Sequence, residues 1–245
     1  MRSPHVGLVW AAAGLFLLLG CSQTTARASE QLTTTTASTT ASPRHGLRVE
    51  RSPTALERSV LAEVNRMRRD PAAYADVLRL WQGQYRGELL LVPGQNKAIR
   101  TVEGEPALTE AIAVLEHTRA LPRLTAVEAL ARAAGDHVNT QGATRTIGHR
   151  GHDGSNSLQR ISRHGRSRGR SAEVIDYGWD RAQDIVVDLL VDDGIKDRGH
   201  RRALLDPVYV VAGVACGPHQ RYGIMCVVEM AERFEIPPVT IASAE

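Results

Sequence analysis

Residues 208–233 read VYVVAGVACGPHQRYGIMCVVEMAER, and this stretch decides the fold class. Two apolar runs, roughly 208–216 and 222–233, are separated by residues that favour a turn, so they predict two antiparallel strands. The helical patterns lie before them in the chain. Helices followed by strands indicate an α+β domain with an antiparallel sheet, not alternating α/β units.

The two strand runs carry Cys216 and Cys226 on either side of nine turn-rich residues, GPHQRYGIM. In an exported chain we expect a disulfide between them, and closing so short a loop stabilises a fold by roughly 2–3 kcal/mol. Without export, two reduced and buried thiols in neighbouring strands are favoured instead.

Amphipathic helices are predicted over much of the chain before these strands. The first contains an apolar stripe at helical spacing, formed by Leu56, Val60, Val64 and Met67. Asp70-Pro71 marks the N-cap and first turn of a second helix. Further helices are expected over 106–120, over 125–138 with a Thr125–Glu128 capping box, and over 181–193.

Two segments lack this periodicity. Residues 82–106 hold repeated Gly and Pro, and we expect an irregular insertion there. Residues 141–172 are rich in Gly, Ser and Arg and predict a long connection, a kind of segment that often carries function.

Length and composition are those of a globular protein. The 245 residues are 42% apolar and 23% charged, which fits one folded domain once the N-terminus is set aside. The formal net charge of +3 comes without a nucleic-acid motif, so no nucleic-acid partner is expected.

The N-terminus predicts export. The apolar run VGLVWAAAGLFLLLG ends at Gly20, follows Arg2 and His5, and is too short for a membrane span, so residues 1–20 read as a signal peptide. Leu18-Leu19-Gly20-Cys21 is similar to a bacterial lipobox, in which Cys21 is lipidated and attaches the protein to the membrane. Ordinary cleavage nearby, with Cys21 incidental, is the alternative.

These readings divide the chain. Residues 21–53 are a Thr/Ser-rich tether, residues 54–236 the folded domain, and residues 237–245 a tail. The expected location is the outer membrane or cell surface as a lipoprotein, or the exterior as a secreted protein.

Four polar residues are candidates for a functional cleft: His149, Glu173, Asp192 and His200. Each also has a simpler explanation as a surface histidine, an exposed loop acid or a turn residue. Asp192 is the hardest to explain locally, because a negative charge in the last turn of a helix opposes the macrodipole and calls for a nearby cation. Converging imidazoles and carboxylates can hold a metal, relay protons or orient a ligand.

Five segments resemble, in order and spacing, the CAP superfamily (cysteine-rich secretory proteins, antigen 5 and pathogenesis-related protein 1). They read GHRGHDGS (148–155), AEVIDYG (172–178), DIVVDLLVDDG (184–194), RGHRRALLDP (198–207), and VVAGVACGPH…YGIMCVVEMA (210–231). The opening VLAEVNRMRRDPAAYADVL is similar to the first helix of bacterial members, so the resemblance covers roughly residues 56–234.

The resemblance implies an α-β-α sandwich with a central antiparallel sheet flanked by helices. His149, Glu173, Asp192 and His200 would line its cleft, with His149 and His200 ligating a divalent metal such as zinc and the two acids supporting them. Some family members also bind lipids or sterols at apolar grooves. No common enzymatic activity is established for the fold.

The resulting hypothesis is an exported, lipid-anchored module of the bacterial envelope that binds a small ligand, either a lipid or a divalent metal, or a partner. One alternative is a metal-assisted hydrolase of peptides or esters using the same cleft, although HExxH and GxSxG are missing from the sequence. Another is a structural envelope protein without a ligand. No catalytic residue is assigned.

Overall fold

The computed structural model describes residues 52–96 and 98–236. The predicted signal peptide, Cys21, nearly all of the tether and the tail lie outside these residues. The described helices are α1 (Ala55–Arg69), α2 (Pro71–Arg79), α3 (Glu105–Glu116), α4 (Glu128–Gly142), α5 (Ser157–Ser162), α6 (Ala182–Val191) and α7 (Gly199–Leu204). In the described part of the chain, no helix is long and apolar enough to cross a membrane.

The large sheet has four strands in the order β4-β6-β7-β5. Its three long strands are antiparallel: β5 (Arg166–Tyr177), β6 (Val211–His219) and β7 (Gly223–Glu235). The two-residue edge strand β4 (Thr125–Ala126) pairs parallel with β6. The predicted hairpin is confirmed, and its register places Cys216 opposite Cys226, where they form the expected disulfide.

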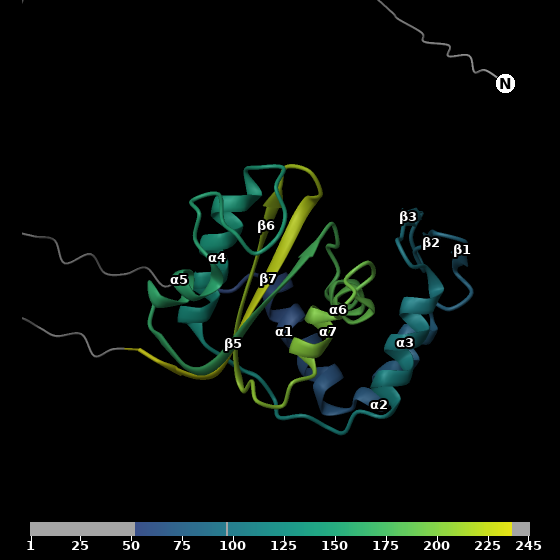
Figure 1. Cartoon of the computed structure of the whole chain (residues 1–245), viewed down its shortest axis with the longest axis horizontal. Helices are drawn as coiled ribbons and strands as arrows, with labels where there is room; N and C mark the ends of the chain where they lie inside the picture. The colour runs from purple at the N-terminus through teal and green to yellow at the C-terminus, as the bar shows by residue number, and fades with distance from the viewer. Residues whose placement is uncertain (1–51, 97, 237–245) are drawn as a thin grey trace, which may run out of the picture. The chain divides into compact units, whose positions relative to one another are not determined.

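Helices cover both faces of this sheet, which confirms the expected α+β sandwich. Side chains alternate along β7: Met225 and Val227 pack with residues of α4, whereas Val228 and Met230 join the core that contains α1 and α6. Figure 1 shows α4 to one side of β6 and β7, and α6 to the other. A Cβ on Gly213 of β6 would lie 2.0 Å from the backbone nitrogen of Ala131, so a glycine here lets α4 approach the sheet.

Helix starts were predicted with mixed success. Asp70 caps α2 as expected, because its side chain accepts a hydrogen bond from Ala73 N at 3.0 Å and Pro71 follows it. The Thr125–Glu128 capping box is wrong. Thr125 instead pairs with Val211 in the sheet, and α4 begins after Val127 without a side-chain cap.

Residues 82–106, predicted to be an irregular insertion, contain regular structure. They build a small antiparallel sheet from β1 (Tyr85–Arg86), β2 (Leu89–Leu91) and β3 (Ala98–Arg100). The strands are two or three residues long, too short for an alternating pattern to be visible in the sequence.

The predicted long connection over 141–172 contains α5 and the first half of β5. The strand was missed because residues 166–171 read RSRGRS, which has no apolar alternation. Polar contacts with neighbouring segments accompany the strand pairing here: Arg168 Nε lies 2.9 Å from Glu235 Oε2, and Arg170 Nη2 lies 2.6 Å from Asp206 Oδ2.

Candidate functional site

A cavity of about 800 Å³ contains all four predicted site residues in its lining. It is bounded by β5, by the loop between α6 and α7 with α7 itself, by the loop that carries His149 and by the small sheet, and its walls are largely apolar. The apolar wall residues include Trp81, Tyr85, Leu90, Ile99, Trp179 and Val191. Trp81 and Trp179 contact each other, with ring centroids 5.5 Å apart.

His149 projects from a loop that is held by groups on α4 and β5. Gly148 N donates to the Tyr177 hydroxyl at 2.9 Å, and Gly148 O accepts from Gln141 Nε2 at 2.8 Å and from His137 Nε2 at 2.9 Å. Burial lowers the pKa of His137, so its ring is neutral and donates through Nε2. The backbone just before His149 is therefore fixed.

Glu173, on β5, orients the His149 ring. Its Oε1 lies 2.9 Å from His149 Nδ1, and its Oε2 lies 2.5 Å from Nη2 of Arg160, which is fully buried. Burial opposes ionisation of Glu173, but the hydrogen bond from His149 and the Arg160 charge outweigh it and lower its pKa. Glu173 is thus a carboxylate that accepts the Nδ1 proton of His149.

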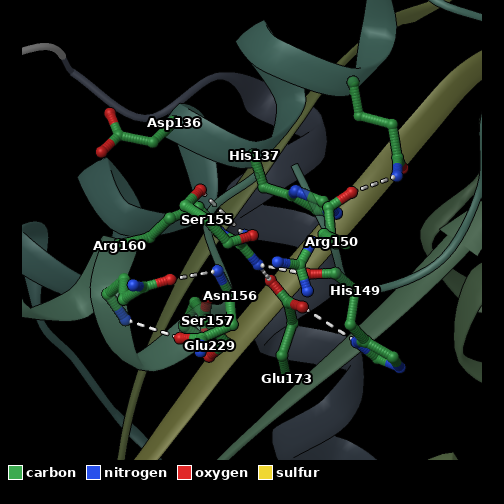
Figure 2. A network of polar contacts seen from close by, with 12 residues as sticks. Asp136, His137, His149, Arg150, Ser155, Asn156, Ser157, Arg160, Glu173 and Glu229 are labelled. Atoms are coloured by element: carbon green, nitrogen blue, oxygen red, sulfur yellow. Dashed lines mark hydrogen bonds and ion pairs between the residues drawn. The ribbon is translucent and has the colours of Figure 1, made fainter. Parts of the chain in front are cut away.

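Arg160, the last residue of the first turn of α5, connects the parts of this network. Its Nη2 also donates to the carbonyl of His149 at 3.1 Å, and its Nη1 donates to that of Ser155 at 2.9 Å. Figure 2 shows Glu173 between His149 and Arg160. One guanidinium therefore holds both the loop that carries His149 and the carboxylate that orients its ring.

Glu229 lies directly behind Glu173. The two residues are register partners on β7 and β5, and Ser157 Oγ donates to Glu229 Oε2 at 2.7 Å. Burial, with the neighbouring Glu173 charge, raises the pKa of Glu229 well above its usual range. The buried pair therefore holds one proton, on Glu229, and one negative charge, on Glu173.

Asp192 plays the corresponding role for His200. It ends α6 in the left-handed conformation (φ 55°), which turns its side chain toward the start of α7. Its Oδ1 lies 2.8 Å from His200 Nδ1, and its Oδ2 accepts from the backbone nitrogens of His200 at 2.9 Å and Arg201 at 3.3 Å. The charge that opposes the dipole of α6 is thus placed at the first amides of the next helix.

The two imidazoles face a common space. Their ring centroids are 6.1 Å apart, and each Nδ1 is held by a carboxylate. Each Nε2, on the other side of its ring, has no hydrogen-bond partner among residues 52–96 and 98–236. The structure therefore brings together His149, Glu173, Asp192 and His200, which are spread over some fifty residues of sequence.

The atoms placed to bind a metal ion in this cavity are the Nε2 atoms of the two histidine rings. Within the described ranges, no group of three or more His, Cys, Asp or Glu side chains is arranged to hold a metal ion. Both acids are engaged with Nδ1 atoms, so two Nε2 lone pairs are the donors that remain for a cation or a hydrogen-bonding ligand.

Sequence reasoning missed Arg160 and Glu229. In the sequence Arg160 is one of several arginines in the predicted connection, and nothing in that pattern separates a buried arginine from an exposed one. Glu229 did carry a signal, since it is a single acid within the apolar run CVVEMA of a predicted strand. A charged residue in such a run is either at an exposed position or paired in the interior.

A comparison with protein families agrees with the resemblance in the sequence. The family model described as the cysteine-rich secretory protein family, CAP, matches residues 61–230. Among solved structures, the chain is similar to an outer surface protein from Borrelia burgdorferi, with 22% identity over 46% of this chain and 80% of that chain and a TM-score of 0.39. No curated protein matches the chain. Because the family model spans most of the described domain, the chain belongs to the cysteine-rich secretory protein (CAP) family.

Proposed function

We propose that this protein is an exported small-ligand-binding module of the bacterial envelope, whose cleft holds a divalent cation on His149 and His200. The observation that carries the proposal is the matched pair of carboxylate–histidine contacts, Glu173 to His149 and Asp192 to His200, at 2.9 and 2.8 Å. Two Nε2 atoms are left directed at one cavity.

The donor chemistry fits a cation such as zinc. Metal-binding histidines commonly donate their other ring N–H to a carboxylate, which fixes the tautomer and makes the ligating nitrogen more basic. Two imidazoles leave coordination positions for water or for a ligand, as in zinc sites that remain open. In this arrangement Glu173 and Asp192 position the rings and the histidines bind.

The walls support a ligand with an apolar part. A cavity of about 800 Å³ falls within the range of small-molecule sites. Four of its polar side chains meet at the two histidines and the acids that hold them, whereas Trp81, Leu90 and Ile99 form an apolar part of the walls. This division favours an amphiphile, lipid or sterol-like, whose polar end lies at the imidazoles.

The location of the protein is part of the proposal. The signal peptide and the lipidation site at Cys21 lie outside the described residues and stay predictions from the sequence. An anchored or secreted domain would meet envelope lipids and extracellular metal ions.

Isothermal titration of the metal-stripped chain with Zn²⁺ tests the proposal. We expect binding near one equivalent that is lost in His149→Ala/His200→Ala. The control His117→Ala/His152→Ala removes two exposed histidines outside the cleft and should bind zinc as the unmodified chain does. Equal zinc binding by the cleft variant and the control would refute the metal assignment.

A further inference from the structure

A second groove, of about 630 Å³, lies between α1 and the segment 120–123, and none of its lining residues belongs to the histidine cavity. Four exposed arginines line it, and no acidic residue does: Arg58, Arg66, Arg69 and Arg123. We call it the arginine groove. Nothing in the cleft chemistry accounts for this concentration of positive charge.

The walls of the arginine groove are fixed by buried contacts. Asn65 on α1 donates to Leu124 O at 3.0 Å and accepts from Leu124 N at 2.8 Å. Fully buried Arg68 donates to Pro122 O at 2.8 Å, and its own carbonyl accepts from Leu121 N at 2.8 Å. The segment is therefore held against α1, and the groove exists without a ligand.

The positive charge of the groove is largely unneutralised. Arg66 pairs with Glu63 at 3.0 Å, and Arg58 donates to the uncharged carbonyl of Pro53. The side chains of Arg69 and Arg123 make no hydrogen bond or ion pair with any residue that the structure describes. An anionic group in the groove would meet the guanidinium groups of Arg69 and Arg123, which have no other partner in the described part of the chain.

The floor between the arginines is apolar, formed by Leu61, Ala62, Ala120 and Leu121. We propose that the arginine groove binds the phosphodiester headgroup of an anionic phospholipid. Guanidinium groups match the geometry of phosphate oxygens through paired N–H donors. The apolar floor would receive the glycerol and upper acyl carbons that a free phosphate ion lacks.

The position of the groove in the chain fits this occupant. The described chain begins at Ser52, two residues before Thr54, the N-cap of α1. The predicted tether thus joins the end of the helix that forms the groove, and a lipid on Cys21 would keep the domain within reach of a bilayer. The proposal does not depend on the histidine cleft, because vesicle binding and zinc binding are measured separately.

Vesicle co-sedimentation of the full chain with Cys21→Ser, which removes any lipid anchor, tests the charge requirement. We expect binding to mixed phosphatidylglycerol and phosphatidylcholine vesicles and none to phosphatidylcholine alone. Arg69→Gln/Arg123→Gln should weaken partitioning roughly 10- to 30-fold, the effect of losing two near-surface cations. The control Arg145→Gln/Arg166→Gln removes two exposed arginines elsewhere. Equal weakening by the control would show dependence on net charge alone and overturn the site.

A second variant tests the floor without removing an arginine. Ala62 is exposed on α1 within the groove, and Ala62→Glu places a negative charge beneath the four arginines. It should abolish vesicle binding, whereas Ala113→Glu, at an exposed position of α3, should leave it unchanged. Circular dichroism verifies that each variant is folded. Displacement from vesicles by excess glycerol phosphate, or equally tight binding to a DNA oligonucleotide, would overturn the assignment to a phospholipid.

Discussion

Glu173 and Glu229 are register partners on adjacent strands, and both side chains are buried behind His149. Two neighbouring buried carboxyl groups cannot both ionise at low cost, so their surroundings drive their two pKa values apart. Arg160 and His149 stabilise the charge on Glu173, whereas Glu229 is left with a hydroxyl donor from Ser157 and a burial penalty. His149 is therefore oriented by a carboxylate, Glu173, whose negative charge is stabilised by its surroundings.

The first prediction concerns Glu229→Gln. Because the pKa of Glu229 is raised in the fold, the unfolded chain releases its proton first, and the residue's contribution to stability is lost as pH rises. Glutamine cannot ionise. Above the ordinary glutamate pKa, the stability of Glu229→Gln relative to the unmodified chain should rise by up to about 1.4 kcal/mol per pH unit. Urea unfolding between pH 5 and about 8 measures the difference, and parallel stability curves would contradict the shared proton.

A second prediction concerns Arg160→Met. This change leaves the Glu173 charge buried without its cation and should cost about 3–5 kcal/mol in the free energy of unfolding. Arg163→Gln removes an arginine three residues away whose ion pairs with Asp136 and Asp153 are partly exposed, and should cost less than about 1 kcal/mol. Adding Glu173→Gln to Arg160→Met should recover part of the loss. Denaturant titration of the four chains decides, and similar costs for the two arginines would contradict the proposed role of Arg160.

A third prediction separates positioning from general charge at the second histidine. Asp192→Asn replaces the carboxylate that accepts from His200 Nδ1 and should weaken zinc binding about 10- to 100-fold. Asp193→Asn is the matched control, because that carboxylate accepts from the amides of Val102 and Glu103 and contacts neither cleft histidine. Nitrogen-15 shifts of the His200 ring should report a change of tautomer only in Asp192→Asn. Equal zinc affinity in both variants would count against the positioning role.

A fourth prediction compares two glycines at the contact between α4 and the sheet. Gly213→Ala should destabilise the fold by about 1–3 kcal/mol or more, the cost of overpacking a core, because its Cβ would lie 2.0 Å from Ala131 N and 2.2 Å from Leu130 C. Gly135→Ala on α4 should stabilise by about 0.5–1 kcal/mol, since its Cβ would meet Ala215 Cβ at 3.9 Å and alanine favours helix. Thermal unfolding of both variants tests whether stability falls in the first and rises in the second.

Local patterns in the sequence predicted much of the architecture. The two apolar runs within 208–233 predicted the hairpin and, for an exported chain, the disulfide between its cysteines. An apolar stripe located α1, and the Asp70-Pro71 cap located the start of α2. The predictions failed where another part of the chain supplies the stabilising partner. Thr125 joins a strand 86 residues away instead of capping a helix, and the first half of β5 pairs through polar residues that have no strand pattern.

The residues of the cleft were likewise predictable from the sequence only in part. The order of motifs along the chain was enough to identify His149, Glu173, Asp192 and His200 as candidates. It did not reveal that each acid orients one imidazole, because that depends on distances between side chains that are 8 and 24 residues apart in the sequence. It also did not reveal Arg160 or Glu229, whose roles arise from burial.

The sequence by itself determined the order and type of the main elements, since hydrophobic periodicity and turn chemistry act over a few neighbouring residues. The four cleft residues became one predicted site only through the resemblance of its motifs to the CAP superfamily. Only the tertiary structure decided which groups are buried, which carboxyl of a pair keeps its proton and which arginines stay without partners. Desolvation and charge pairing depend on contacts between distant segments, so they take their values only after the chain has folded.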